Sequence, residues 1–190
     1  MRDIDIRKPL LAALAKEHLH DSNTRVIEEF GLCQGSARVD VAVINGSIHG
    51  YEIKSERDTL YRLPRQQNIY NKVLDSITLV VSNKHLKKAE KEVPIWWGLC
   101  EAQHIEDNVS IQIIRPPKKN KNIDPSALVQ LLWRDEALGI LTARNLQKGV
   151  VSKSREIIWD RILDNLSLDE LRSEVRSHVK ARQHWRPVSQ

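Results

Sequence analysis

The chain has 190 residues, of which 41% are hydrophobic and 29% charged, and its formal net charge is +5. This length supports one well-packed core, or one domain with a small addition. No apolar run approaches the roughly 20 residues of a membrane-spanning helix, so we expect no membrane association. Cys33 and Cys100 lack metal-ligand spacing, which favours a reduced, cytoplasmic protein. The mild basic excess is compatible with a nucleic-acid partner.

The first part of the chain predicts one helix followed by three strands. Leucines recur at helical spacing over residues 6–19, and Asp3 or Asp5 is placed to cap that helix. Asn45-Gly46 is a strong hairpin signal. Segments with alternating apolar and polar side chains surround it and predict strands over residues 24–32, 38–44 and 48–55.

The length of the hairpin loop decides which side chains share a face of the sheet. A two-residue loop puts Asp40 and Glu52 on opposite faces. A three-residue loop pairs Ile44 with Ile48 and brings Asp40 directly opposite Glu52. Because a slip of one residue flips a whole strand, burial of the apolar side chains favours the second register. The sequence therefore predicts that two carboxylates meet on neighbouring strands.

Similar reasoning adds a third carboxylate from the first strand. If Leu32 pairs with Ala37, Glu29 lies opposite Asp40 and joins the same polar patch. The apolar face of that strand would then hold Val26, Phe30 and Leu32, with Glu28 as the exception.

The rest of the chain predicts further strands and then helices only. A helix is expected over residues 58–76, a buried strand over 77–82 and a short helix over 85–92. Two more strands are expected over residues 95–100 and 109–115. After a Pro- and Lys-rich linker or exposed loop at 116–121, the pattern predicts helices over 125–139, 142–147, 154–165 and 168–182. We therefore divide the chain into a core, residues 1–117, and a helical C-terminal region, residues 122–190. The helical region would serve either to bind DNA or to pack on the core.

Asp40, Glu52 and Lys54 form the constellation with the clearest chemistry. Glu52 and Lys54 are two apart on a strand and therefore share a face. Carboxylate oxygens suit Mg²⁺ or Mn²⁺, with the carbonyl of Ile53 as a further ligand. The ammonium of Lys54 would orient a water or neutralise charge during phosphodiester hydrolysis. The alternative is a surface salt bridge on a solvated face.

The helix after these strands carries further candidates. Gln66 and Tyr70 are four apart and share a helix face, from which Gln66 would position a water or a phosphate oxygen. Arg62 and Arg65 lie next to this position and would hold a nucleic-acid backbone, with Tyr70 on the same side. The alternative for all four is an ordinary polar helix face.

Together these residues resemble the PD-(D/E)xK nuclease superfamily, which has the restriction-endonuclease-like fold. The resemblance rests on the order of the elements, on Asp40, and on Glu52-Ile53-Lys54. The segment from Gln66 to Tyr70 is similar to the Gln-x-x-x-Tyr segment of the exonuclease branch that includes the RecB nuclease domain. Residues 1–115 resemble small stand-alone bacterial or phage members of the superfamily.

The resemblance implies an α/β fold with an αβββαβ core, a mixed sheet, and divalent-metal cleavage of DNA. It assigns Asp40 and Glu52 to the metal and Lys54 to catalysis. The chain departs from the pattern at Val39, where the superfamily often has proline. The first acidic ligand is open, because the superfamily often places it on the opening helix. Glu17 is the candidate there, whereas strand pairing favours Glu29, or Glu28 beside it.

We therefore expect a metal-dependent deoxyribonuclease that uses Mg²⁺ or Mn²⁺ and acts on DNA. The alternative is a non-catalytic DNA-binding or assembly protein on the same fold. The oligomeric state is left open, with a homodimer as one option.

Overall fold

The computed structural model describes residues 1–106 and 108–182. Asp107 and the last eight residues of the expected helical region, 183–190, lie outside the described part. The N-terminal elements are α1 (Asp3–Glu17), β1 (Arg25–Leu32), the 3-10 turn η1 (Cys33–Gly35), β2 (Ala37–Ile44), β3 (Ile48–Lys54), α2 (Leu63–Val73), β4 (Ser76–Ser82), α3 (Asn83–Glu92), β5 (Gly98–Ile105) and β6 (Asn108–Arg115). The C-terminal elements are α4 (Pro125–Leu128), the 3-10 turn η2 (Val129–Leu131), α5 (Arg134–Ala143), α6 (Arg155–Asn165) and α7 (Leu168–Ala181).

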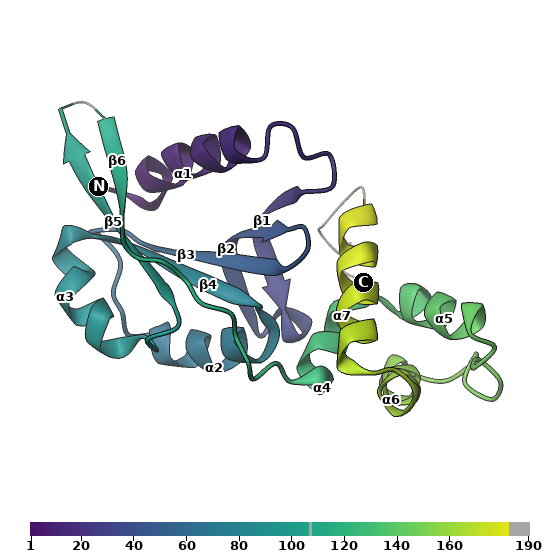
Figure 1. Cartoon of the computed structure of the whole chain (residues 1–190). Coiled ribbons are helices and arrows are strands. Elements are labelled where there is room, and N and C mark those ends of the chain that lie inside the picture. The colour runs from purple at the N-terminus through teal and green to yellow at the C-terminus, as the bar shows by residue number, and fades with distance from the viewer. Residues whose placement is uncertain (107, 183–190) are drawn as a thin grey trace.

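The protein has a mixed α/β architecture built on a single six-stranded sheet (Figure 1). The strands lie side by side in chain order, β1 to β6. The pairs β1–β2, β2–β3 and β5–β6 are antiparallel, whereas β3–β4 and β4–β5 are parallel. The predicted α/β class with a mixed sheet is therefore confirmed. None of the described helices is both long and apolar enough to cross a bilayer.

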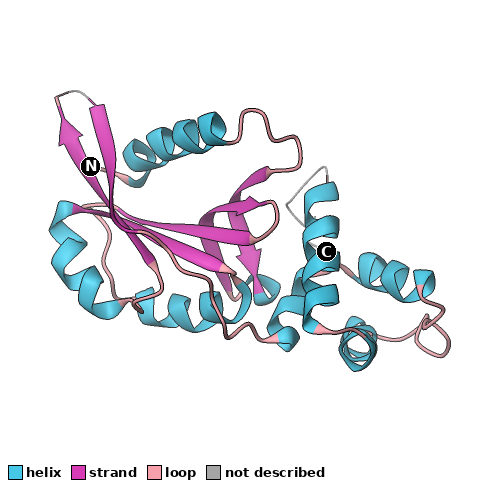
Figure 2. Ribbon diagram, in the orientation of Figure 1, coloured by secondary structure: helices cyan, strands magenta, loops and turns pink. Residues whose placement is uncertain are grey.

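Helices cover both faces of the sheet (Figure 2). Helix α1 lies on one face, where Ile6, Leu10 and Leu14 pack against Val41 and Val43. Helices α2 and α3 lie on the other face.

A larger apolar cluster fills the side of α2 and continues into the C-terminal helices. It joins Leu79 of the sheet and Val73 of α2 to Val175 of α7, and all three side chains are almost fully buried. The sheet and the C-terminal helices therefore share one continuous core.

Both predicted hairpin registers are confirmed. Ile44 pairs with Ile48, so the β2–β3 loop has three residues, and Leu32 pairs with Ala37. The side-chain oxygen of Asn45 accepts a hydrogen bond of 3.1 Å from the backbone N–H of Ser47 and closes the loop.

The regular alternation of β1 and β2 breaks beside the candidate site. Glu29 has a φ of +55°. Ile27 and Phe30, which are three positions apart and would lie on opposite faces of a regular strand, both belong to the large cluster. The predicted burial of Val26 is wrong, because the break exposes 37% of this residue. On β2, Val39 belongs to the large cluster and not to the face of its predicted companion Val41. A strand that is regular in sequence is therefore distorted at the level of Glu29 and Asp40.

Several predicted boundaries are wrong, each for a local reason. The first helix begins at Asp3 and is preceded by Arg2, so Asp3 lies within it. The second helix begins only at Leu63, because Asp58 accepts bonds from the N–H (2.8 Å) and the hydroxyl (2.6 Å) of Ser55 and forms a turn. The predicted strand over 95–100 starts at Gly98, after both tryptophans.

In the C-terminal region, the predicted helices over 125–139 and 142–147 are replaced by α4, η2 and α5. Extended backbone at Leu132 separates η2 from α5, and Asn145, with a φ of +59°, lies in the turn after α5. Asp124 caps α4 and Ser167 caps α7, since the side chain of each accepts a backbone N–H from its helix.

Candidate active site

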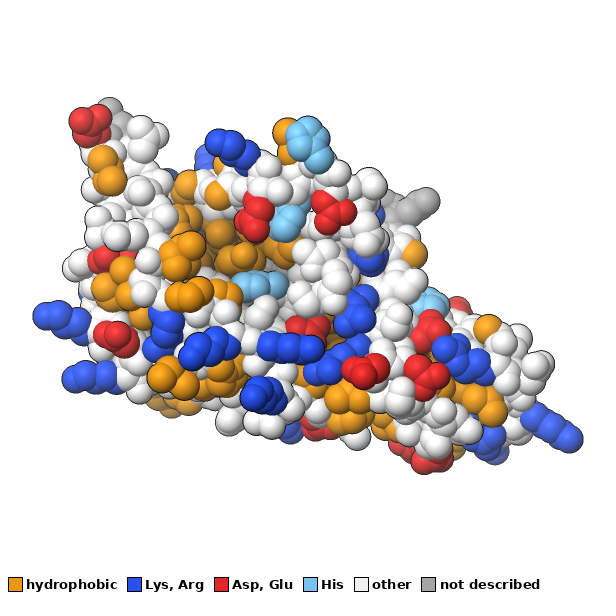
Figure 3. Space-filling model, viewed as in Figure 1, with side chains coloured by type: hydrophobic (Ala, Val, Ile, Leu, Met, Phe, Trp, Pro, Cys, Tyr) orange, Lys and Arg blue, Asp and Glu red, His pale blue; other side chains and the backbone are white. Residues whose placement is uncertain are grey.

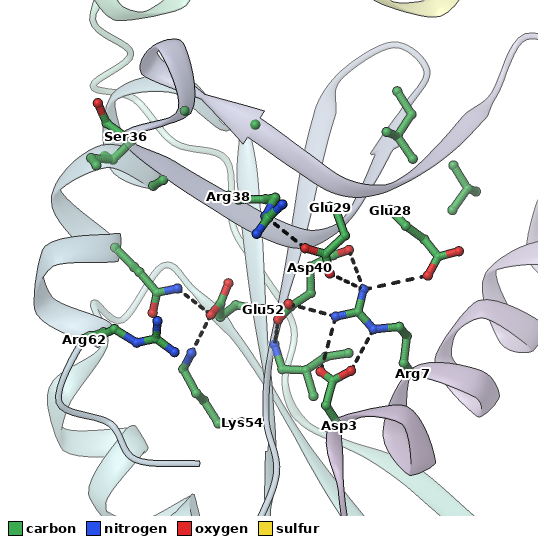
Figure 4. Close-up of a pocket in the computed structure, with 18 of the residues that line it drawn as sticks. Asp3, Arg7, Glu28, Glu29, Ser36, Arg38, Asp40, Glu52, Lys54 and Arg62 are labelled. Atoms are coloured by element: carbon green, nitrogen blue, oxygen red, sulfur yellow. Dashed lines mark hydrogen bonds and ion pairs between the residues drawn. The ribbon is translucent and has the colours of Figure 1, made fainter. Parts of the chain in front are cut away.

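A large open cavity of about 1440 Å³ lies beside β1 and the end of β3 (Figure 4). Its walls come from α1, β1, β2, β3, the start of α2, and α7. The predicted site residues that line it are Glu28, Glu29, Asp40, Glu52, Ile53, Lys54, Arg62, Arg65 and Gln66. Glu17, the alternative first acidic residue, is not part of the lining. The chain thus gathers at one cavity side chains that the sequence places on four separate segments.

Glu52 and Lys54 form a buried ion pair at this cavity. Only 2% of Glu52 and 5% of Lys54 are exposed. Lys54 Nζ donates to Glu52 Oε1 at 2.5 Å. Taking both charges out of water is costly, and a buried pair contributes little net stability compared with packed apolar residues. This cost is more easily understood if the pair serves a ligand than if it only supports the fold.

Gln66 and Tyr70 of α2 hold the same carboxylate. Gln66 Nε2 donates to Glu52 Oε1 at 2.7 Å, and the hydroxyl of Tyr70 lies 2.6 Å from Glu52 Oε2. Burial, followed by the charge of Glu52, raises the pKa of Tyr70, so the phenol stays protonated as a donor. The side-chain oxygen of Gln66 is buried and has no hydrogen-bond partner among the described residues. Gln66 and Tyr70 therefore hold Glu52 in place, and the side-chain oxygen of Gln66 stays available as a hydrogen-bond acceptor.

Asp40 lies where β2 is distorted, between Val39, which packs in the large cluster, and Val41, which packs under α1. Its Oδ2 accepts a hydrogen bond of 2.6 Å from the backbone N–H of Ile53, and its Oδ1 accepts one of 2.9 Å from Arg7. Burial and the negative charge of Glu52 raise its pKa to about 7, although Ile53 and Arg7 act in the opposite direction. The β2–β3 backbone pairing ends at Val41 and Tyr51. Beyond that point, the side chain of Asp40 and not its backbone accepts the N–H of Ile53.

Arg7 of α1 is the site residue that sequence reasoning missed. Its guanidinium is within 2.8–2.9 Å of carboxylate oxygens of Asp3, Glu29 and Asp40, and only 8% of the residue is exposed (Figure 4). Asp3 also lines the cavity. The spacing of four between Asp3 and Arg7, typical of a helical ion pair, is the only signal in the sequence.

The side chains at this cavity offer few oxygen ligands for a divalent cation. No group of three or more His, Cys, Asp or Glu side chains within residues 1–106 and 108–182 is arranged to hold a metal. Glu29, the predicted third carboxylate, instead pairs with Arg7 at 2.8 Å and Arg38 at 2.9 Å. Asp40 and Glu52 are paired as well, with Arg7 at 2.9 Å and Lys54 at 2.5 Å, and they act on each other through their charges. Mg²⁺ often takes only one or two carboxylates from the protein and completes its shell with waters and phosphate. Asp40 and Glu52 are the residues that would hold the ion.

Two cations at the mouth of the cavity have no internal partner. The side chains of Arg62 and Arg65 line the cavity, are exposed, and make no ion pair or hydrogen bond with any described residue. Arg38, by contrast, is paired with Glu29. The two free guanidinium groups are placed to meet an anionic ligand that enters the cavity.

Comparison with known proteins places the chain in a phage family. A family model described as Bacteriophage P4 protein cII matches residues 1–188. The chain belongs to this family. Protein cII of Enterobacteria phage P4 is 27% identical over 187 residues, which cover 97% of this chain and 69% of that relative.

A similar solved structure is the SPO1766 protein of unknown function from Silicibacter pomeroyi. It is 23% identical and covers 75% of this chain and 94% of its own, with a TM-score of 0.43. A likeness at this level does not establish a common fold, and it adds nothing to the assignment of the P4 cII family member described here.

Proposed function

We propose that the protein is a divalent-metal-dependent deoxyribonuclease with a restriction-endonuclease-like core. The observation that carries the proposal is the meeting of Asp40, Glu52 and Lys54 in one cavity with two unpaired arginines at its mouth. The order α1, β1, β2, β3, α2, β4 supports it, because it matches the αβββαβ order expected from the sequence.

Each residue of the cavity would have a distinct task. Asp40 and Glu52 would hold Mg²⁺ or Mn²⁺, which supplies an activated water and neutralises phosphate charge when bound. Lys54 would direct its ammonium to the attacked phosphate, where negative charge develops. Gln66 and Tyr70 would keep Glu52 in place.

Arg62 and Arg65, at the start of α2, would bind the DNA backbone next to the scissile phosphate. Guanidinium groups suit this role because they meet phosphate oxygens with two parallel hydrogen bonds. Contacts of this kind position a nucleic acid but do not read its sequence.

Cleavage assays test the proposal directly. Linear, circular and single-stranded DNA should be incubated with the protein in Mg²⁺ or Mn²⁺. Lys54→Met should lower the rate by about 100-fold or more, because it removes one charge aimed at the phosphate. Lys91→Met, an exposed lysine at the end of α3, is the matched control and should cleave like the wild type.

Mn²⁺ binding separates the steps. Calorimetric titration should show binding to the wild type and to Lys54→Met but none to Asp40→Asn. Failure of the wild type to bind Mn²⁺ would refute the proposed metal chemistry, and unchanged cleavage by Lys54→Met would assign the activity to another site or a contaminant.

A second candidate is a DNA-binding or assembly protein without catalysis. It is favoured by the degree to which the site satisfies itself, since all four carboxylate oxygens of Asp40 and Glu52 accept hydrogen bonds from the chain. This candidate predicts DNA binding that is indifferent to Mn²⁺ and unaffected by Asp40→Asn.

A further inference from the structure

A second cavity lies at the seam between the sheet and the C-terminal helices. It encloses about 530 Å³. One wall is α7, with Arg172 and Arg176, and the opposite wall is the connection from β6 to α4, with Lys118 and Lys119. Figure 1 shows this connection running along the molecule to the base of α7, and in Figure 3 Lys and Arg side chains gather across the same face.

The lysine wall is held rigidly, although its sequence is typical of a loose linker. The N–H of Lys118 donates to the carbonyl of Trp96 at 2.8 Å, and the N–H of Asn120 donates to that of Asp75 at 2.7 Å. The side chain of Asn120, only 3% exposed, donates to the carbonyls of Asn71 (2.7 Å) and Leu74 (3.0 Å). The expectation of a linker or exposed loop is therefore replaced by an anchored segment that presents Lys118 and Lys119 at a fixed position.

The arginine wall is only partly neutralised. Arg172 lies 3.5 Å from a carboxylate oxygen of Asp75 and 3.5 Å from one of Asp169, both long contacts. Its Nε is buried and has no hydrogen-bond partner in the described part of the chain. The second oxygen of Asp75 already accepts the N–H of Ile48 at 2.8 Å. The atom that faces Asp75 at 3.5 Å is this same Nε, so the charge of Arg172 is met only loosely within the chain.

The charges of the two walls do not balance. Four cations line the cavity against two carboxylates, Asp75 and Asp169, and the side chain of Asp169 is 94% exposed to water. Lys118, Lys119 and Arg176 make no ion pair with any residue that the structure describes. Like charges fixed close together repel one another, and an anion between them relieves that repulsion.

Helix α7 connects this cavity to the candidate active site. Arg172, Arg176 and Val179 have the spacing i, i+4, i+7 and so lie along one side of the helix. The first two line the second cavity, and Val179 lines the first. Val179 follows Arg176 by three positions in the helix, a rise of about 4.5 Å. The second cavity also includes Ser47, which precedes β3 at the end opposite Lys54. Seven residues of strand span roughly 23 Å, so a nucleic-acid strand would reach this cavity several nucleotides away from Lys54.

We propose that the second cavity binds the phosphate backbone of the nucleic acid outside the cleavage site. The identity of the ligand rests on the proposed function, whereas the anion-binding chemistry rests on the cavity itself. Lys118, Lys119 and Arg176 supply the contacts, which are independent of base sequence.

Binding measured without a metal tests this inference. The variant carries Lys118→Gln, Lys119→Gln and Arg176→Gln, and its ligand is a fluorescent DNA strand of about 20 nucleotides in EDTA. The plot of log affinity against log salt should become shallower by about 2 units, and affinity at low salt should fall about tenfold or more. Mn²⁺ binding should be unchanged, because none of the three residues lines the first cavity.

A matched triple variant controls for net charge. Lys87→Gln, Lys91→Gln and Lys148→Gln remove three exposed lysines that line neither cavity. Equal slopes for the two triple variants would overturn the inference, and so would a wild type that binds no DNA. Inorganic phosphate should also be added to both proteins in thermal melts. If phosphate stabilises the wild type but not the cavity variant, while the variant still binds DNA normally, the site takes small anions and the inference is wrong. A reduced slope in a protein that cleaves nothing would support the cavity and refute the nuclease, so the two proposals fail separately.

Discussion

At the scale of single residues, Asp40 shows how its surroundings change a side chain. On a regular, solvated strand it would be an ordinary carboxylate. Here burial and the charge of Glu52 outweigh Arg7 and the N–H of Ile53, and its pKa rises to about 7. A carboxylate that is hard to ionise in the free protein binds a cation more tightly once ionised, because the cation removes the repulsion. Metal binding should therefore strengthen as the pH rises towards and past 7.

The same shift predicts how stability depends on pH. The ordinary pKa of Asp40 is 3.8, so the folded protein binds this proton more tightly than the unfolded chain. The contribution of Asp40 to stability is then largest below about pH 4, falls between pH 4 and 7, and stays low above 7. Asp40→Asn, which carries no charge, should raise the free energy of unfolding at pH 8 by about 1–3 kcal/mol in EDTA, with little effect at pH 4.

Thermal melts at both pH values check this expectation. Asp164→Asn, at an exposed position on α6, is the control and should show no such pH dependence. A variant Asp40→Asn that melts below the wild type at pH 8 would show that the contact with Arg7 outweighs the cost of burying the charge.

At the scale of elements, the sequence was most informative where burial and turn chemistry agree. The loop at Asn45-Gly46 could be placed because only one register buries the apolar side chains of both strands. The break at Glu29 could not be found, because a non-glycine residue with positive φ leaves no pattern in the sequence. At the break Glu29 forms ion pairs with Arg7 of α1 and with Arg38 of β2, two contacts made by the folded chain.

Two glycines in different elements should respond to alanine in opposite ways. A Cβ at Gly98, the first residue of β5, would lie 2.7 Å from the hydroxyl of Thr78 and 2.9 and 3.0 Å from atoms of Pro117. Gly98→Ala should therefore destabilise the protein by about 1–3 kcal/mol. At Gly139, within α5, a Cβ would meet no atom within 4 Å apart from the neighbouring backbone of its own helix, and Gly139→Ala should stabilise by about 0.5–1 kcal/mol.

Urea unfolding of both variants provides the measurement. The midpoint should fall for Gly98→Ala and rise for Gly139→Ala without a change in slope. Equal midpoints would mean that the connection after β6 yields freely at Pro117, which would also weaken the case for a rigid second cavity.

At the scale of the whole molecule, the apolar cluster extends from the sheet to α7. The division at residues 117–122 was drawn from a change in composition, since strands give way to helices and a Pro- and Lys-rich segment lies between them. Composition does not reveal which surfaces later pack together. Val175 and Val179 of α7 belong to the same cluster as Leu79 and Phe30 of the sheet. The candidate cavity could likewise be predicted from the strands, but not its wall from α7.

This shared core predicts that the chain unfolds in a single step. Far-UV circular dichroism and tryptophan fluorescence should give the same transition in urea, because neither part keeps its core alone. Val175→Ala, which removes two buried methyl groups' worth of packing in α7, should move both curves together by about 1–2.5 kcal/mol. Two separate transitions would instead establish residues 1–117 and 122–190 as independent domains.

Asn120 links the lysine-rich segment to the helix behind the candidate active site. By binding the carbonyls of Asn71 and Leu74, it finishes the last turn of α2, the helix that presents Gln66 and Tyr70. The lysine-rich segment thus binds the C-terminal end of α2, and the same helix holds Glu52 through Gln66 and Tyr70. A displacement of this segment would move α2 and, with it, the residues that position Glu52. The two cavities are therefore mechanically coupled through one helix.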